Sequence, residues 1–414
     1  MNKWKKSVRS LCLGMALMMS VSWTAFAATD GATGPGQAAG GTVSGAVPSG
    51  ATVTSQNAAQ PTVAAQGAVL YDATHNQFLF SKNADTQYYP ASITKLMTAL
   101  LVLEALDRDE IALTDSVQIS PRAAAMKGSQ ALLDANAVYP LEDLLRTTIM
   151  ASANDSAVAL SEYIAGSEEN FVDRMNRRAA ELGMTNTNYV NCTGYPQSGQ
   201  YTTARDVCRL CCEIAKHPRY NQYASVWIDK LTHPGGRVTD LTNTNRLVRF
   251  YEGCDGYKTG STDAAKYCLA ATAEKNGMRL VAIVLGTPVS QTRFNEARQM
   301  LDYGFATYRR VVIANKGDLL GQNVEVRGGS AESVPLALGS GLSMLLKNGQ
   351  QSGLSLSVQL PESVDAPIAQ GDVIGLVDVL LDGQVIAKLN CVAAEDVPRP
   401  GFIEGLLRIL RNWR

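Results

Sequence analysis

Histidine is scarce in this sequence of 414 residues, which contains only His75, His217 and His233. There is no HExxH motif and no paired CxxC motif. These absences give little support to a histidine-based catalytic triad or to a zinc site. Basic residues are not in excess either, because 33 Lys and Arg face 38 Asp and Glu once residues 1–27 are set aside. A nucleic-acid-binding protein needs a basic field, so the charge balance argues against nucleic acid as a partner.

The first 27 residues have the three parts of a secretory signal. Residues 11–21 are mostly apolar, and Ala25-Phe26-Ala27 is a small-x-small cleavage site. A basic stretch precedes them, made of Lys3, Lys5, Lys6 and Arg9. No later apolar run approaches the ~20 residues of a transmembrane helix. We therefore expect an exported protein whose mature chain begins after residue 27.

Seven of the eight cysteines follow this segment, and an odd number is not typical of a disulfide framework. Cys208, Cys211 and Cys212 share one predicted helix and are conceivable metal ligands. The pattern favours the alternative, in which they are small buried apolar side chains. We expect neither a metal nor a cofactor.

The organisation of the chain follows its composition. Residues 28–66 consist almost entirely of Gly, Ala, Thr, Ser, Gln, Val and Pro, which predicts a disordered tether. Such a tether either extends the protein away from a surface or has no task of its own. Residues 67–310 predict a mixed domain with a strand pair at 68–71 and 77–80 and further strands at 256–261, 266–273 and 279–285. The apolar run 280–285 is typical of a sheet covered on both faces. The expected helices cover 92–106, 141–150, 154–165, 168–182, 203–216 and 290–308.

Residues 311–397 predict a small all-β domain, with a hairpin of 373–381 and 384–392 joined by Asp382-Gly383. Residues 398–414 close the chain, and a helix over 402–414 would place its apolar side chains and Trp413 on one arc and Arg408 and Arg411 opposite. This pattern favours an amphipathic helix that contacts a membrane surface, and packing on the β domain is the alternative.

The first motif of chemical interest is Ser92-Ile93-Thr94-Lys95, at the start of a predicted helix. Residues three apart lie on the same helical face, so the Ser92 hydroxyl and the Lys95 amine can touch. A serine needs a base to become a nucleophile, and an amine is a base only when burial or a nearby cation removes its proton. Most isolated S-x-x-K strings are surface residues, so this motif needs support from others.

Two further motifs follow. Ser152-Ala153-Asn154 lies at a tight junction between two predicted helices, where a hydroxyl can relay a proton and an amide can hold a carbonyl; helix capping is the alternative. Lys258-Thr259-Gly260 lies on a predicted strand, where a cation and a hydroxyl can receive a carboxylate. The glycine lets an extended substrate lie along the strand edge, with Ser261 supplying a backbone N–H.

In this order, at intervals of 60 and 106 residues, the motifs resemble those of the active-site serine penicillin-recognising enzymes. The sequence is most similar to the low-molecular-mass D-alanyl-D-alanine carboxypeptidases, and the strings at 89–98, 181–184, 255–262 and 293–296 extend the similarity over roughly 67–310. The resemblance implies an α+β fold: a β-lactamase/transpeptidase-like catalytic domain, with an antiparallel sheet flanked by helices, before the all-β domain and the terminal amphipathic helix.

The resemblance also implies an acyl-transfer mechanism on peptidoglycan stem peptides ending in D-Ala-D-Ala, with β-lactams as covalent inhibitors. Ser92 would be the nucleophile, Lys95 its base and Ser152 a proton relay. The substrate-binding residues would be Asn154 for the acyl chain, Lys258 and Thr259 for the terminal carboxylate, Gly260 at the strand edge, Ser261 with Ser92 for the oxyanion, and Arg293 for the carboxylate. A surface role for Arg293 is the alternative. The implied location is the outer face of the cytoplasmic membrane, the cell wall or the periplasm.

Three alternatives remain open. A class A β-lactamase uses an acidic residue for deacylation, but residue 153 is Ala and residues 183–194 contain no acid. A non-catalytic sensor of β-lactams or of the cell wall would signal through spanning helices, which the sequence lacks. A third alternative is a structural wall-binding protein that works through the β domain alone. The filled motif positions favour the carboxypeptidase.

Overall fold

The computed structural model describes residues 59–403. The expected signal at 1–27, the tether up to residue 58 and residues 404–414 of the terminal helix lie outside the described residues. No helix within 59–403 combines the length and the apolar character that crossing a bilayer requires.

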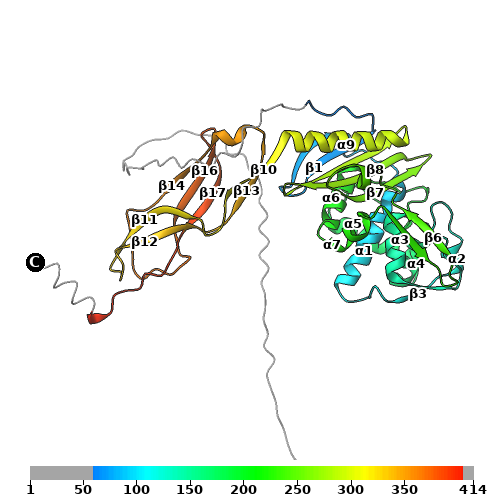
Figure 1. The fold of residues 1–414 in the computed structure, drawn as a ribbon, viewed down its shortest axis with the longest axis horizontal. Helices are drawn as coiled ribbons and strands as arrows, with labels where there is room; N and C mark the ends of the chain where they lie inside the picture. The colour runs from blue at the N-terminus through cyan, green and yellow to red at the C-terminus, as the bar shows by residue number, and fades with distance from the viewer. Residues whose placement is uncertain (1–58, 404–414) are drawn as a thin grey trace, which may run out of the picture. The chain divides into compact units, whose positions relative to one another are not determined.

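The catalytic part is built on a five-stranded antiparallel sheet in the order β2-β1-β9-β8-β7. Helix α9 (Ser290–Thr307) lies along one face, and the remaining larger helices cover the other (Figure 1). The strands are β1 (Gly67–Asp72), β2 (Gln77–Lys82), β7 (Cys254–Thr262), β8 (Lys266–Lys275) and β9 (Met278–Thr287). This arrangement confirms the predicted α+β class, and β7 is left at an edge of the sheet.

Strand β9 shows why the sheet needs cover on both sides. Val281 and Ile283 belong to the hydrophobic core shared with the helical layer, whereas Leu280, Ala282 and Val284 belong to the core under α9. Successive side chains of a strand point to opposite faces, so a continuous apolar run serves two cores. The prediction drawn from residues 280–285 is therefore confirmed.

The helical layer packs around α1 (Lys95–Asp107), which is buried along most of its length and follows a short 3₁₀ turn, η1 (Ala91–Thr94). Gly166 ends α4 in the left-handed conformation, which glycine adopts without strain. The other helices are α2 (Pro121–Ala124), α3 (Leu141–Met150), α4 (Asn154–Ala165), α5 (Glu168–Glu181), α6 (Ala204–Ile214), α7 (Pro218–Ala224) and α8 (Leu247–Phe250). Two small two-stranded sheets pair β3 (Ser116–Gln118) with β4 (Val138–Pro140) and β5 (Ile228–Thr232) with β6 (Val238–Thr242).

The cysteines of α6 belong to this layer. Cys208 and Cys211 are buried in the core, and all seven cysteines within the described residues are free thiols. Burial raises the pKa of both thiols well above the ordinary value. Cys208 and Cys211 therefore act as small apolar side chains, as the sequence favours. Cys212 differs, because it is only partly buried and a hydrogen bond with Cys208 lowers the pKa of its thiol.

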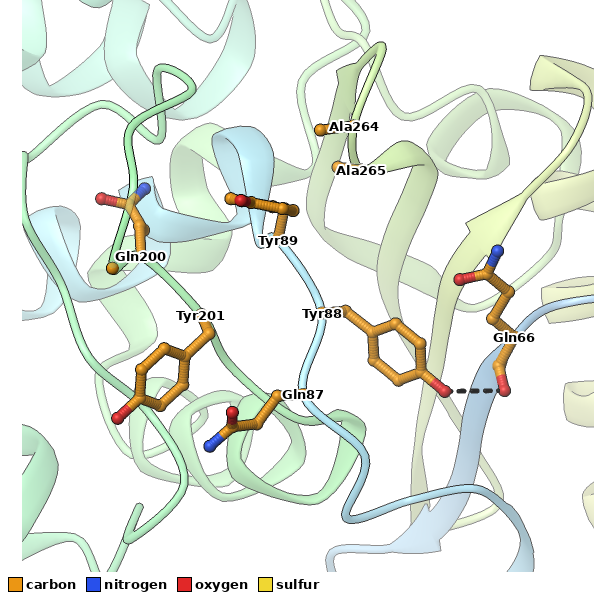
Figure 2. Close-up of a pocket in the computed structure, with 9 residues that line it drawn as sticks. Gln66, Gln87, Tyr88, Tyr89, Gln200, Tyr201, Ala264 and Ala265 are labelled. Carbon is orange, nitrogen blue, oxygen red and sulfur yellow. Dashed lines mark hydrogen bonds between the residues drawn. The ribbon is translucent and has the colours of Figure 1, made fainter.

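The end of the segment predicted as a tether packs against the catalytic part. Ala64 and Ala65 donate backbone hydrogen bonds to the Glu296 carboxylate at 2.5 and 3.1 Å, and Val63 and Ala65 are buried. The expectation of a disordered chain as far as residue 66 is wrong for residues 63–66. The Glu296 carboxylate binds the backbone of Ala64 and Ala65, and the side chains of Lys82 and Tyr88 donate to the carbonyls of Val63 and Gln66 (Figure 2 shows the bond from Tyr88).

The C-terminal part is all-β, as predicted. Its six-stranded sheet has the order β14-β16-β17-β12-β11-β15, and β10 pairs with β13. Asp382 and Gly383 both have positive φ between β16 and β17, which matches the predicted hairpin turn. The elements are β10 (Tyr308–Ala314), β11 (Leu319–Arg327), β12 (Ser333–Leu338), β13 (Leu342–Lys347), η2 (Gln350–Gly353), β14 (Leu354–Gln359), β15 (Ser363–Asp365), β16 (Val373–Leu381) and β17 (Gln384–Ala393).

Candidate active site

Ser92 and Lys95 lie one turn apart where η1 leads into α1. The Lys95 amine donates hydrogen bonds to Ser92 Oγ at 3.1 Å and to the Thr193 carbonyl at 2.7 Å. Ala91, directly before the serine, has a φ of 47°, a conformation that costs an L-residue energy and that marks many functional turns. The contact predicted from the S-x-x-K spacing is therefore present.

Lys95 is buried, and burial lowers the pKa of its amine to about 7. The Cys192 thiol and the Asp155 carboxyl oppose that shift. Burial raises the pKa of the Cys192 thiol well above its usual value. Near neutral pH, a substantial fraction of Lys95 is therefore uncharged and able to accept a proton.

Ser152 lies between α3 and α4 with a φ of 62°, and its side chain is buried. The N-cap residue of α4 is Ala153, so the capping role that the sequence allowed for Ser152 or Asn154 is not used. Asn154 instead bonds the segment opposite: its Nδ2 donates to the Lys127 carbonyl at 2.6 Å, and its backbone N–H donates to the Ser129 carbonyl at 2.7 Å.

Strand β7 lies against the nucleophile turn at Gly260. A Cβ atom at this position would lie 3.0 Å from the Pro90 carbonyl oxygen and 3.1 Å from the Ser92 nitrogen. Such contacts are tighter than ordinary packing, so the glycine allows the strand to approach Ser92. Ser261 follows on the same strand and is exposed.

Thr244 connects β7 with the junction that carries Ser152. The Thr259 hydroxyl donates to the Thr244 hydroxyl at 2.7 Å, and the Thr244 backbone N–H donates to the Met150 carbonyl at 3.1 Å. Met150 is the last residue of α3, two positions before Ser152. This chain of hydrogen bonds ties the second motif to the third.

Lys258 is fully buried on β7, where its amine donates to the Thr259 carbonyl at 3.1 Å. Burial lowers the pKa of this amine well below its ordinary value, and the positive charges of Lys95 and Arg293 lower the pKa further. Lys95, Lys258 and Arg293 therefore share one electrostatic environment. A negatively charged ligand group would relieve their mutual repulsion.

Arg293 lies on α9 with a buried guanidinium, so the alternative of a surface arginine is wrong. Its Nη1 donates to the carbonyls of Gly260 at 3.0 Å and Cys268 at 3.3 Å, and its Nη2 donates to Ser290 Oγ at 3.3 Å. The buried Nε has no partner within residues 59–403. Arg293 on α9 thus stabilises β7 and β8 beside the nucleophile by binding their backbone carbonyls.

The loop at 191–194 completes the site, and the sequence analysis missed it. Thr193 supplies the carbonyl that binds Lys95, and Asn191 Oδ1 accepts the backbone N–H of Gly194 at 2.7 Å. A Cβ atom on Gly194 would lie 1.8 Å from the Ala91 carbonyl oxygen. Asn191 three residues before a glycine indicates a turn, but the sequence alone does not show that this turn lies behind the nucleophile.

Comparisons with known proteins agree with this geometry. The D-alanyl-D-alanine carboxypeptidase family model matches residues 54–289, and that of the penicillin-binding protein 5 C-terminal domain matches residues 308–399. The D-alanyl-D-alanine carboxypeptidase DacF of Bacillus subtilis is 36% identical over 350 residues, covering 84% of this chain and 90% of that protein. The D-alanyl-D-alanine carboxypeptidase DacC of Escherichia coli is 33% identical over 414 residues. The match covers 97% of this chain and 95% of that protein.

Among solved structures, penicillin binding protein 5 from Haemophilus influenzae superposes with a TM-score of 0.67 at 33% identity. The match covers 83% of this chain and 100% of that one. Sequence motifs, site geometry and both domain matches therefore agree, and the chain belongs to the D-alanyl-D-alanine carboxypeptidase family of serine peptidases.

Proposed function

We propose that this protein removes the terminal D-alanine from peptidoglycan stem peptides through an acyl-enzyme on Ser92, and that penicillin acylates the same serine. The observation that carries the proposal is the 3.1 Å contact between Ser92 Oγ and a buried Lys95 amine whose pKa is about 7. A hydroxyl beside an amine that is partly neutral at physiological pH is an activated nucleophile.

In the proposed reaction, Ser92 Oγ attacks the carbonyl carbon between the two D-alanines while Lys95 accepts the hydroxyl proton. The carbonyl oxygen becomes negative between the backbone N–H groups of Ser92 and Ser261, and each such donor is often worth about 3 kcal/mol. The C–N bond then breaks as Ser152 relays a proton to the nitrogen of the leaving D-alanine. Water hydrolyses the ester and restores Ser92.

The substrate carboxylate is assigned to Lys258 and Thr259, with Arg293 adding positive charge behind the strand. Support comes from the burial of Lys258 and Arg293, which disfavours their charged forms, because a bound carboxylate would stabilise those forms. Asn154 is assigned to the acyl chain. Gly260 leaves the strand edge open to an extended substrate.

A class A β-lactamase uses a carboxylate that is free to activate the deacylating water. Asp155, the carboxylate that acts on Lys95, is not free in this sense. Its oxygens accept the backbone N–H groups of Ala131 at 2.9 Å, Leu133 at 3.1 Å and Ser156 at 2.9 Å. We therefore expect a long-lived penicillin adduct rather than rapid penicillin hydrolysis.

The test combines two measurements on the full mature chain. Intact-mass spectrometry with penicillin should show one stoichiometric adduct, and a diacyl-D-Ala-D-Ala peptide should release D-alanine; Ser92→Ala should lose both. Labelling without D-alanine release would instead favour a sensor, and rapid penicillin turnover would favour a β-lactamase. Either result would overturn the proposal.

The ends of the chain carry a second part of the proposal, namely export by a signal at 1–27 and peripheral membrane contact by residues 402–414. The start of the terminal segment supports it, because Phe402 and Ile403 are 88% and 74% exposed. Apolar side chains this exposed favour an apolar partner, and the arginines that follow suit an anionic lipid surface. Flotation with anionic liposomes should be lost on truncation after Val397, and unchanged flotation would refute the membrane contact. The mature N-terminus of the exported protein should be Ala28.

A further inference from the structure

Thr244 lies within hydrogen-bonding distance of a hydroxyl to which the proposed function assigns the substrate carboxylate. The Thr259 hydroxyl donates to Thr244 Oγ1 at 2.7 Å. A threonine hydroxyl has one hydrogen to donate and two lone pairs that accept. While this bond exists, Thr259 therefore has no hydrogen left for a carboxylate.

The hydrogen of the Thr244 hydroxyl, in contrast, has no acceptor within residues 59–403. The bond from Thr259 is the one side-chain hydrogen bond that Thr244 makes in this range. Thr244 is also partly exposed, whereas Thr259 is only 5% exposed. The two hydroxyls thus bring two hydrogens to one place, and a ligand with two acceptor oxygens could take both.

Two buried asparagines hold the backbone of Thr244 in place. The Asn243 side chain donates to two backbone carbonyls just before β5 and accepts the backbone N–H of Asn245 at 2.9 Å. The Asn245 side chain donates to the Gly256 carbonyl on β7 at 2.8 Å, and the Thr244 backbone N–H donates to the Met150 carbonyl at 3.1 Å. A donor whose position is fixed before the ligand binds loses little conformational freedom on binding.

We propose that Thr244 is a specificity-determining residue: when substrate binds, the hydroxyls of Thr244 and Thr259 each donate to one oxygen of the terminal carboxylate. This inference rests on the proposed function. The bond between the two neutral hydroxyls is exchanged for two bonds to a charged acceptor. Bonds to a charged acceptor are roughly twice as strong, so the exchange favours binding. A carboxamide has no charge and only one acceptor oxygen, so the same pair of donors disfavours it.

Two activated acyl donors that differ in one group test this selection on the full mature chain. A diacyl-D-alanyl thioester of thioglycolate carries a carboxylate where the substrate has its own, and the thioester of thioglycolamide carries a neutral amide there. Thioesters acylate a serine more readily than amides do, so release of the thiol is measurable for both. We expect the parent to prefer the carboxylate donor in kcat/KM. Thr244→Val should lower this preference about tenfold, mainly by raising the KM of the carboxylate donor.

The ratio of the two kcat/KM values separates recognition from a general structural defect, which would slow both donors alike. Thr244→Ala should show the same loss as Thr244→Val, and Thr244→Ser, which keeps the hydroxyl, should keep the parent ratio. Thr242→Val is the matched control and should also keep the parent ratio. Thr242 is an exposed threonine on β6 without a side-chain hydrogen bond in the described part of the chain.

A preference in Thr244→Val and Thr244→Ala equal to that of the parent would refute the role of Thr244 and leave the proposed function intact. The same conclusion would follow if the parent showed no preference for the carboxylate donor. The proposed function itself fails on a different measurement, namely if the parent releases no D-alanine from a diacyl-D-Ala-D-Ala peptide.

Discussion

Gly194→Ala should inactivate the protein although the residue supplies no side chain. The added Cβ would lie 1.8 Å from the Ala91 carbonyl oxygen and 2.3 Å from its carbon, whereas ordinary contacts between heavy atoms are about 3.5 Å. Both partners are backbone, so the clash cannot be relieved by a side-chain rotation. Either Ala91, next to the nucleophile, or the loop that binds Lys95 through Thr193 must move by more than about 1 Å.

The expected loss follows from two costs. A φ of 83° costs alanine about 1–2 kcal/mol, and the overpacking adds about 1–3 kcal/mol. Displacing a catalytic group by about 1 Å can lower a rate about 100-fold. We therefore expect the free energy of unfolding to fall by roughly 2–5 kcal/mol and the acylation of Ser92 by penicillin to slow at least about 100-fold.

Gly183→Ala is the control, because Gly183 also has positive φ, at 70°, but an added Cβ there would meet nothing within 4 Å. In this variant the free energy of unfolding should fall only by the conformational cost of about 1–2 kcal/mol, and the acylation rate should stay unchanged. Stopped-flow acylation and denaturant unfolding of both variants give the comparison. An acylation rate in Gly194→Ala equal to that of the parent would refute the contact between the 191–194 loop and the nucleophile turn.

Three further perturbations test other parts of the structure. The rate of Ser92 acylation should rise with pH through an apparent pKa of about 7, because only neutral Lys95 accepts the proton; a flat profile from about pH 5 to about pH 9 would contradict this. Thr259→Val should raise the KM of a D-Ala-D-Ala peptide about tenfold with a smaller change in kcat, since a hydrogen bond to the substrate carboxylate is lost. Steady-state kinetics measure both constants, and an unchanged KM would exclude Thr259 from the carboxylate site. Glu296→Ala should lower the free energy of unfolding by about 1–3 kcal/mol, because the backbone of Ala65 loses its acceptor; thermal unfolding measures this, and unchanged stability would contradict the anchoring of residues 63–66.

The sequence was sufficient for features that depend on local geometry. Spacing of three residues predicted the contact between Ser92 and Lys95, because helical geometry alone brings such residues together. The continuous apolar run of β9 predicted a sheet with two covered faces, and the Asp382-Gly383 pair predicted the β16–β17 turn. Each of these inferences needs only neighbouring residues.

Features that depend on distant partners were not predictable. The pattern around Arg293 does not show that its guanidinium reaches the carbonyls of β7 and β8. Thr244 lies between the β5–β6 hairpin and α8, which are too short to give a clear apolar period, so its link between two motifs was missed. Residues 63–66 have a composition typical of a tether, and the Glu296 carboxylate that binds the Ala64 backbone lies 232 positions away along the chain.

The two buried amines explain why a free terminal carboxylate suits this site. Burial disfavours the positive charge of both Lys258 and Lys95, and the charge of Lys95 further lowers the pKa of Lys258. In the proposed mechanism, a carboxylate bound at Lys258 stabilises the charged form of that amine selectively, because the carboxylate is its direct partner. The charged Lys258 then favours the neutral form of Lys95, which is the form that can take the proton of Ser92. In this mechanism, Lys258 both binds the terminal carboxylate of the substrate and makes Lys95, rather than itself, the base.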